Sequence, residues 1–238
     1  MTTDPMLNAT DGERPGVRAE RANARPPGPE LITPELFGSG QIAPDSGAAG
    51  QIAFIGLGSN LADPQRQIEQ ALTELATLPQ TCLRAASRLY RTAPVGPLVA
   101  SPGAPLRSQP DFVNAAARLA TTLTPAALLL ALQQLERRHG RVRDGTRWGP
   151  RTLDLDLLLF GDLVQTAASL QLPHPQLHRR AFVLVPLADI APPTLVVPGQ
   201  GCLGDLLAAV ARTGVEPLAG WQPVDARWAD DARTAVPR

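Results

Sequence analysis

Residues 153–160 constrain the fold of this chain more than any other segment, because leucine and aspartate alternate over the first five of them. Successive side chains of a β-strand point to opposite faces of the sheet, so Asp154 and Asp156 share one face and the leucines share the other. The pattern therefore predicts a strand over residues 152–160. This strand packs its leucines on a core and presents two neighbouring carboxylates on its second face.

These carboxylates lie beside a cluster of cations in the sequence. Two ionised carboxylates at this spacing repel each other unless a cation lies near them, and Mg²⁺ prefers such hard oxygen ligands. Arginine can hold phosphate oxygens through two parallel hydrogen bonds, and Gly149-Pro150 predicts a stiff turn among the arginines. The segment therefore indicates a metal and phosphate site, in which four arginines accompany the carboxylates: Arg141, Arg143, Arg147 and Arg151.

Composition excludes several other chemistries. The 238 residues carry a formal net charge of zero and a pI near 6.8, so no overall basic field indicates a nucleic-acid or membrane partner. The sequence contains no lysine, which excludes a phosphate-loop lysine and a Schiff base. Cys82 and Cys202 lack the paired spacing of a disulfide framework or a zinc site. No apolar run approaches the roughly 20 residues of a membrane-spanning helix, and we expect a cytoplasmic monomer.

The amino-acid composition of the chain changes near residue 51. Residues 1–50 are rich in Pro, Gly, Ala, Asp and Arg and show no hydrophobic period, which predicts a disordered extension. A folded domain is expected over residues 51–222, followed by a loose tail over residues 223–238. Two further helices are expected in the C-terminal part of the domain, at residues 182–190 and 203–211.

Hydrophobic periodicity predicts alternating strands and helices in the centre of the chain. Asp63-Pro64 and Thr124-Pro125 each pair a capping side chain with proline at the first helical position, which predicts helices over residues 64–78 and 125–140. The order β-α-β-β-α-β is that of a ferredoxin-like α/β (α+β) sandwich with its helices on one sheet face. Strands are expected at residues 52–58, 82–90, 112–120 and 152–160.

Five ordered motifs cover about residues 51–200. The strongest is Arg-Trp-Gly-Pro-Arg-Thr-Leu-Asp-Leu-Asp at residues 147–156. The others are Gly-Leu-Gly-Ser-Asn-Leu at 56–61, Tyr-Arg-Thr-Ala-Pro-Val-Gly-Pro at 90–97, Gln-Pro-Asp-Phe-Val-Asn-Ala at 109–115, and Leu-Pro-His-Pro at 172–175 with Arg-Ala-Phe at 180–182. Together they resemble the 6-hydroxymethyl-7,8-dihydropterin pyrophosphokinase family of the folate pathway.

This resemblance implies a reaction and a set of binding residues. The reaction is transfer of a pyrophosphoryl group from ATP to the pterin hydroxymethyl oxygen, with release of AMP. The resemblance implies two Mg²⁺ ions, held between the triphosphate and Asp154 and Asp156, and catalytic contacts of Arg141 and Arg151 with the phosphates. It further implies that the nucleotide is bound by Gln133, Glu136, Arg143, Trp148, Leu157, His174 and Arg180.

A pterin is a flat heteroaromatic ring with several donors and acceptors, so its pocket needs aromatic faces and a side-chain amide. Phe112 and Phe182 supply such faces in the matched motifs, together with Trp148, and Asn114 supplies the amide. The resemblance implies that the same pocket is also lined by Thr92, Pro94 and Val95.

Two other functions are compatible with parts of the sequence. A metal-dependent nucleotidyltransferase could use the same aspartate pair, but it would transfer a nucleoside monophosphate and release pyrophosphate. A ferredoxin-like nucleic-acid-binding module could place arginines on phosphates and phenylalanines on bases. The neutral net charge and the paired aspartates count against this module, because two carboxylates would repel a nucleic-acid backbone.

Overall fold

The computed structural model describes residues 50–94, 109–141 and 149–221, all within one compact unit. The expected disordered extension, apart from Gly50, and the expected tail at residues 223–238 lie outside the described residues. The elements are β1 (Gln51–Ser59), α1 (Pro64–Ala76), β2 (Thr81–Ala86), β3 (Tyr90–Thr92), β4 (Phe112–Thr121), α2 (Pro125–Arg138), β5 (Asp154–Phe160), β6 (Gln165–Ala167), β7 (Leu170–Leu172), the 3₁₀ helix η2 (Leu177–Arg179), α3 (Ala181–Ile190), β8 (Val196–Val197), β9 (Gly201–Cys202), α4 (Leu203–Ala209) and β10 (Val215–Pro217).

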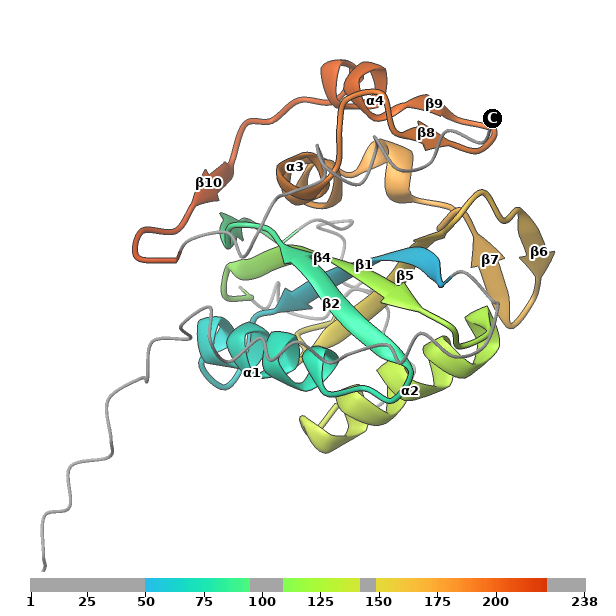
Figure 1. Ribbon diagram of the computed structural model, residues 1–238. Coiled ribbons are helices and arrows are strands. Elements are labelled where there is room, and N and C mark those ends of the chain that lie inside the picture. Colours follow the sequence, from blue (N-terminus) through green and yellow to red (C-terminus); the bar gives the residue numbers. More distant parts are fainter. Residues whose placement is uncertain (1–49, 95–108, 142–148, 222–238) are drawn as a thin grey trace, which may run out of the picture. The chain divides into compact units, whose positions relative to one another are not determined.

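One antiparallel sheet runs through the centre of this unit in the strand order β10-β3-β4-β1-β5 (Figure 1). β4 pairs with β1 along most of its length, and on its other side it pairs with β3 and then with β2. β5 pairs with β1 and has α2 among its neighbours. The described residues therefore form a mixed α/β fold with an antiparallel sheet and four α-helices.

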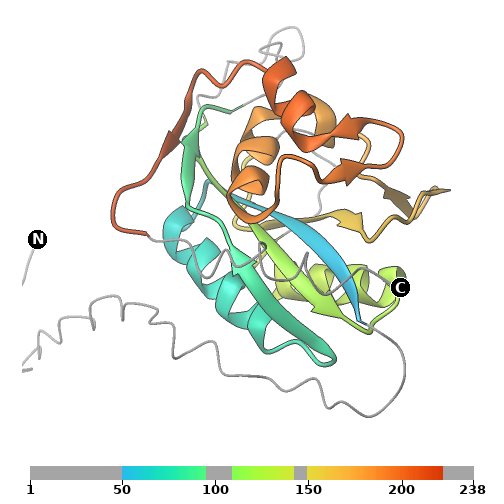
Figure 2. The same ribbon diagram turned by 45° about the horizontal axis from the view of Figure 1, so that its top comes forward.

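Helices cover both faces of the sheet. α1 and α2 lie on one face, and α3 and α4 lie on the other (Figures 1 and 2). Leu72 of α1 and Leu132 of α2 belong to one buried core cluster, whereas Leu184 and Leu187 of α3 belong to a second. The two helices of the expected β-α-β-β-α-β unit therefore share one face, and the C-terminal helices, for which the sequence predicted no face, cover the other. The reason is that α3 is apolar around most of its surface, so it buries the second face of the sheet.

Both helices of the first face begin where the sequence predicts. Asp63 Oδ1 accepts a hydrogen bond from the amide of Arg66 at 3.4 Å, and Pro64 is the first residue of α1. Thr124 Oγ1 accepts a hydrogen bond from the amide of Ala127 at 3.2 Å at the start of α2. Each cap satisfies an N–H group that the first turn of a helix would otherwise leave without an internal partner.

The alternation in β5 is confirmed. Leu155 and Leu157 are buried in the core under α1 and α2, and the side chains of Asp154 and Asp156 alternate with them. The register between β1 and β5 shifts at Leu158, because Ile55 pairs with Leu157 whereas the preceding residue of β1 pairs with Leu159. Leu158 and Leu159 both belong to the second core cluster. Such a bulge adds one residue to a strand and ends its strict alternation. The two carboxylates therefore lie in the regular part of β5, before the bulge.

The expectation of a single strand over residues 82–90 is wrong, because the segment forms two strands, β2 and β3. Between them the hydroxyl of Ser87 accepts a hydrogen bond from the amide of Ala116 at 2.9 Å and donates one to Arg88 O at 2.7 Å. A serine side chain that bonds to the backbone competes with the regular hydrogen bonds of a sheet. Arg88 is then held by Asp189 of α3, to which its amide donates a hydrogen bond at 3.1 Å.

Several short elements were not predicted from the sequence. They are the β6–β7 hairpin, the β8–β9 pair and β10, which pairs with β3 at the edge of the sheet. Strands of two or three residues are too short to give a hydrophobic period. Among the described residues, no helix combines the length and the apolar character needed to cross a membrane.

Replacing Ser87 with alanine should lower the free energy of unfolding by about 1–3 kcal/mol, because the buried amide of Ala116 would lose its acceptor. Urea denaturation of the two proteins measures this difference. Thr166→Ala, at an exposed position of β6, is the control and should change stability by less than about 0.5 kcal/mol. Equal stability of Ser87→Ala and wild type would contradict the account of the break between β2 and β3.

Candidate active site

Asp154 and Asp156 lie beside two glycines of β1. In the strand register Asp154 pairs with Gly58, and Gly58 pairs with Asn114 of β4 on its other side. Asp156 pairs in the same way with Gly56. A Cβ atom at Gly58 would lie 3.3 Å from Asn114 Oδ1 and 3.9 Å from Asp154 Cβ. Because Gly58 has no side chain, the amide of Asn114 and the carboxylate of Asp154 share one face of the sheet with no side chain of β1 between them.

Asp154 accepts hydrogen bonds from two arginines. Arg141 Nη1 donates to Asp154 Oδ1 and to Glu136 Oε1, and Arg151 Nη1 donates to Asp154 Oδ2. Glu136 is 2% exposed and accepts a further hydrogen bond from the amide of Leu155 at 2.9 Å. Burial acts to lower the pKa of Arg141, but the carboxylates of Asp154 and Glu136 outweigh burial and raise this pKa. The last turn of α2 is thus joined to the first residues of β5 by charged groups.

The ionisation of Asp156 is hindered by its surroundings. Burial raises the pKa of Asp156 to about 7, and repulsion by Asp154 acts in the same direction. The charge of Arg180, the residue before α3, opposes this shift, while burial lowers the pKa of Arg180 itself. Burial and the charge of Arg180 also lower the pKa of His174 to about 4, so the His174 ring is neutral at pH 7.

The oxygen donors of this site suit a hard divalent cation. A cation beside Asp154 and Asp156 would remove the repulsion that raises the pKa of Asp156, and carboxylates are preferred ligands of Mg²⁺. Within residues 50–94, 109–141 and 149–221, no group of three or more His, Cys, Asp or Glu could hold a metal ion. Mg²⁺ is commonly bound by one or two carboxylates together with substrate phosphates and water. The residues therefore fit Mg²⁺ that is shared with a phosphate compound.

A cleft of about 410 Å³ lies between α2, β5 and the β6–β7 hairpin. Its volume falls in the range of small-molecule sites, which is about 300–1,000 Å³. Ser169 and Gln171 of the hairpin form part of the wall, and the sequence had not predicted either of them. The cleft brings together the following predicted residues: Gln133, Glu136, Arg141, Asp154, Asp156, Leu157 and His174.

The predicted pterin residues do not line this cleft. Asn114 Nδ2 donates a hydrogen bond to Thr92 Oγ1 at 2.7 Å, and Thr92 pairs with Phe112, so these three lie together at the adjoining ends of β3 and β4. Pro94 follows β3 and is half-buried. Phe182 lies in the first turn of α3, where the guanidinium carbon of Arg180 is 5.6 Å from the centre of its ring. The predicted residues Val95, Arg143 and Trp148 lie outside the described residues.

Asn60 is a site residue to which the sequence assigned no role. It follows β1 and is 2% exposed. Its Oδ1 accepts a hydrogen bond from the amide of Arg151 at 2.8 Å, its own amide donates to Arg151 O at 3.0 Å, and its Nδ2 donates to Pro110 O at 3.2 Å. Asn60 therefore joins the end of β1 to the segments that precede β4 and β5. The only signal for it was its place in the motif at residues 56–61.

A strand with paired carboxylates, beside guanidinium groups and a cleft of this size, defines a candidate metal-dependent phosphotransferase. Residues 54–192 match the family model of 7,8-dihydro-6-hydroxymethylpterin-pyrophosphokinase (HPPK). The chain belongs to this family, and the resemblance drawn from its sequence motifs is confirmed.

Relatives with assigned names are similar to most of the chain. The 2-amino-4-hydroxy-6-hydroxymethyldihydropteridine pyrophosphokinase of Pseudomonas aeruginosa is 49% identical over 170 residues, which cover 71% of this chain and 98% of that protein. The protein of the same name from Haemophilus influenzae is 42% identical over 159 residues, which cover 67% of this chain and 92% of that protein. Both relatives are named as enzymes, and this chain spans nearly their whole lengths.

Solved structures share the fold at low sequence identity. The wild-type HPPK-DHPS of Plasmodium falciparum with SDX-DHP aligns with a TM-score of 0.51 and 14% identity, over 68% of this chain and 45% of that chain. The chain thus spans less than half of that longer protein, and the likeness supports the fold alone.

The charge state of Asp156 should make the stability of the metal-free protein depend on pH. The pKa of Asp156 is about 7 in the folded protein and ordinarily 3.8. Between these values the folded protein binds more protons than the unfolded chain, so this group lowers the free energy of unfolding as the pH rises from about 4 to about 7. At pH 8 in EDTA, Asp156→Asn should therefore be more stable than wild type by up to about 4 kcal/mol, and at pH 4 the difference should disappear.

Urea denaturation at both pH values measures this effect, and Asp154→Asn is the matched control. It removes the negative charge that faces Arg141 and Arg151 and replaces one of the two acceptor oxygens with an NH₂ group, so it should destabilise the metal-free protein at pH 8. If both variants lose stability to the same extent at pH 8, burial does not oppose the ionisation of Asp156.

Proposed function

We propose that this chain transfers the pyrophosphoryl group of ATP to the hydroxymethyl group of 6-hydroxymethyl-7,8-dihydropterin and releases AMP, as an enzyme of folate biosynthesis. Membership of the family and the names of its relatives support this activity. The observation that carries the proposal is the pair Asp154 and Asp156 at a cleft that also contains Arg141. This set of groups suits a metal-bound triphosphate.

The reaction forms a bond between the hydroxymethyl oxygen and the β-phosphorus of ATP. It breaks the bond between the β-phosphorus and the oxygen bridging to the α-phosphorus, so AMP leaves with that oxygen, and the proton of the hydroxyl group is released to water. Catalysis of such a transfer depends mainly on positioning and electrostatic stabilisation. Asp154 and Asp156 would hold two Mg²⁺ ions, whose charge neutralises the phosphate oxygens during the transfer.

Arg141 and Arg151 neutralise Asp154 when no cation is bound to it. A cation at Asp154 would compete with both guanidinium groups for the same carboxylate oxygens. Their N–H groups would then be available to donate hydrogen bonds to phosphate oxygens, which are strong acceptors for arginine. The two arginines would thus serve as counter-charges in the empty site and as phosphate ligands in the occupied one.

His174 would donate a hydrogen bond to the triphosphate as a neutral ring. Burial lowers the pKa of His174 to about 4, so the ring is uncharged at pH 7. Its Nδ1 accepts a hydrogen bond from the amide of Gln176 at 3.2 Å. The proton of the neutral ring is therefore on Nε2, from which it could be donated to a phosphate oxygen. Gln133, Glu136 and Leu157 would complete the nucleotide side of the same cleft.

The pterin would bind on the other side of Gly58. Asn114 Nδ2 is engaged by Thr92, and Asn114 Oδ1 is directed at the space that a side chain at Gly58 would fill. This oxygen could accept a hydrogen bond from an N–H group of the pterin, while Phe112 and Phe182 would supply stacking faces worth about 0.5–1.5 kcal/mol each beyond burial. Pro94 would lie at the same pocket, and Val95, Arg143 and Trp148, outside the described residues, are proposed to belong to the site.

We also propose that the domain over residues 51–222 has the ferredoxin-like topology. The central strand order β5-β1-β4-β2 with α1 and α2 on one face supports this finer assignment. We further propose that the protein is a monomer that acts in the cytoplasm. The neutral net charge supports only the expected absence of a nucleic-acid or membrane partner.

Product analysis tests the proposed reaction directly. Purified protein with Mg²⁺, ATP and 6-hydroxymethyl-7,8-dihydropterin should form AMP and pterin pyrophosphate in equal amounts, as followed by chromatography and ³¹P NMR. Asp156→Asn should lower kcat by about 100-fold or more, because a metal ligand is lost. Asp162→Asn, an exposed aspartate just after β5, is the matched control and should leave kcat unchanged within about twofold.

Other results of the same experiments would indicate another function. Formation of ADP would exclude pyrophosphoryl transfer. Release of pyrophosphate with an adenylylated pterin would indicate a nucleotidyltransferase. RNA binding that survives replacement of Asp154 and Asp156, without ATP turnover, would indicate a nucleic-acid-binding module.

Gly58→Ala should weaken pterin binding more than ATP binding. The new Cβ would lie 3.3 Å from Asn114 Oδ1, which cannot easily move because Asn114 Nδ2 is bonded to Thr92. We expect the KM for the pterin to rise about tenfold and the KM for ATP to change by less than about threefold. Asn114→Ala in the same background relieves the crowding, so the two substitutions should be non-additive. An equal rise in both KM values would contradict the proposed place of the pterin.

A further inference from the structure

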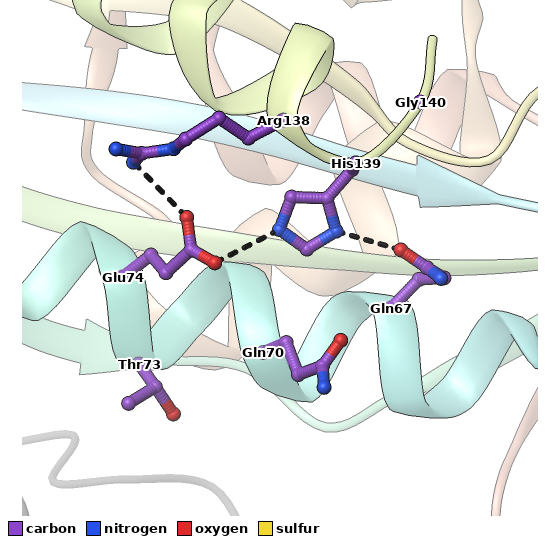
Figure 3. Close-up of a pocket in the computed structure, with 7 residues that line it drawn as sticks. All are labelled: Gln67, Gln70, Thr73, Glu74, Arg138, His139 and Gly140. Atoms are coloured by element: carbon purple, nitrogen blue, oxygen red, sulfur yellow. Dashed lines mark hydrogen bonds and ion pairs between the residues drawn. The ribbon is translucent and has the colours of Figure 1, made fainter.

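Polar side chains join the C-terminal end of α2 to α1, in a groove of about 620 Å³ (Figure 3). This groove shares no residue with the cleft of about 410 Å³ that contains Asp154 and Asp156, which we call the phosphate cleft. His139 Nδ1 lies 2.6 Å from Gln67 Oε1, and His139 Nε2 lies 3.2 Å from Glu74 Oε1. Glu74 also accepts a hydrogen bond from Arg138 Nη2 at 3.1 Å. The side chain of His139 is only 6% exposed, although it lies at the end of a helix. The His139 ring is thus held between two residues of α1.

The backbone after His139 follows the Schellman motif of a helix end. His139 is the capping residue of α2, and Gly140 has a φ of 76°. The amide of Gly140 donates to Arg137 O at 3.0 Å, and the amide of Arg141 donates to Glu136 O at 3.0 Å. These are the two hydrogen bonds of that motif, which requires a left-handed residue and therefore favours glycine. The position of Arg141 is set by the last turn of α2, in which His139 is the anchored residue.

That turn also carries the contacts of α2 with the phosphate cleft. Glu136 accepts hydrogen bonds from Leu155 N–H and from Arg141, and Arg141 also donates to Asp154. The last turn of a helix frays readily when its side chains make no tertiary contacts. On one side this turn is held by β5, and on the other side it is held by His139. A shift of the turn would therefore move Arg141 relative to Asp154.

The contacts of α1 connect this turn with the second arginine of the cleft. Gln67 Nε2 donates a hydrogen bond to Ala62 O at 3.2 Å, in the connection between β1 and α1. Asn60, in the same connection, accepts a hydrogen bond from the amide of Arg151 at 2.8 Å. Arg141 through His139, and Arg151 through Asn60, are thus anchored to one short stretch of chain. Arg141 and Arg151 therefore both depend on the connection between β1 and α1.

We propose that His139 is a positioning residue for Arg141, which it holds in place for the ATP phosphates through its contacts with Gln67 and Glu74. The inference rests on the proposed function, because it requires Arg141 to bind the triphosphate. His139 itself lies on the α1 side of α2 and does not line the phosphate cleft. Its effect must therefore pass through the last turn of the helix.

The test is a double-mutant cycle between His139→Ala and Arg141→Ala. Affinity for α,β-methylene-ATP with Mg²⁺ is measured by calorimetry, and kcat and both KM values are measured with ATP and the pterin. His139→Ala should weaken binding of the analogue about tenfold and Arg141→Ala about 100-fold. The double variant should match Arg141→Ala within about twofold, whereas independent effects would multiply to about 1,000-fold. The KM for the pterin should stay within about twofold in His139→Ala.

Three single variants separate positioning from a loss of stability. His139→Gln keeps an amide donor for Glu74 and should recover at least half of the lost affinity on a logarithmic scale. Gln70→Ala changes a residue of the same groove that no dashed line joins to His139 in Figure 3, so this variant should bind the analogue like wild type. Thr124→Ala removes the N-cap of α2 and so destabilises the same helix at its far end, but it should leave the affinity within about twofold.

The outcomes distinguish the two proposals. Multiplicative effects of His139→Ala and Arg141→Ala would overturn the positioning role, as would an equal loss of affinity in Thr124→Ala. The analogue could bind with the expected coupling while the protein forms no AMP and no pterin pyrophosphate. This outcome would contradict the proposed reaction and support the positioning role of His139. Failure of the wild-type protein to bind the analogue would overturn both.

Discussion

The close approach of two carboxylates on β5 is the constraint on which the rest of the site depends. Asp154 and Asp156 are fixed on one face because Leu155 and Leu157 are buried on the other, so the core holds the two charges near each other. Burial, and then repulsion by Asp154, raise the pKa of Asp156. Guanidinium groups surround the pair: Arg141 follows α2, Arg151 precedes β5 and Arg180 precedes α3.

Each half of the site draws on a different kind of structure. The half that is proposed to bind phosphate is built mainly from α2 and β5, which are consecutive in sequence apart from one connection, while the β6–β7 hairpin and His174 come from further along the chain. The other half requires β3, β4 and α3, which are brought together by the sheet and by packing on its second face. The first half therefore depends on local geometry, whereas the second depends on the complete fold.

This difference explains how far the sequence could predict the structure. Helix starts at Asp63 and Thr124 and the alternation in β5 depend on neighbouring residues, and the structure confirms them. The break at Ser87 depends on hydrogen bonds to Ala116, and the role of Asn60 depends on Arg151. These partners are distant in sequence, so no local pattern could reveal them. The pairing of β10 with β3 and the cover of the second face by α3 are tertiary features of the same kind.

Gly58 is the point at which the two halves meet. Its strand lies between those of Asn114 and Asp154, and any side chain there would contact Asn114 and approach Asp154. Gly58 is the penultimate residue of β1, and a glycine inside a strand weakens the sheet, because it contributes no packing and loses more conformational entropy on folding. The fold accepts this cost at a position where three paired strands already fix the backbone. The gain is an uninterrupted surface between an amide and a carboxylate, which the proposed reaction needs if its acceptor and a phosphate group are to come into contact.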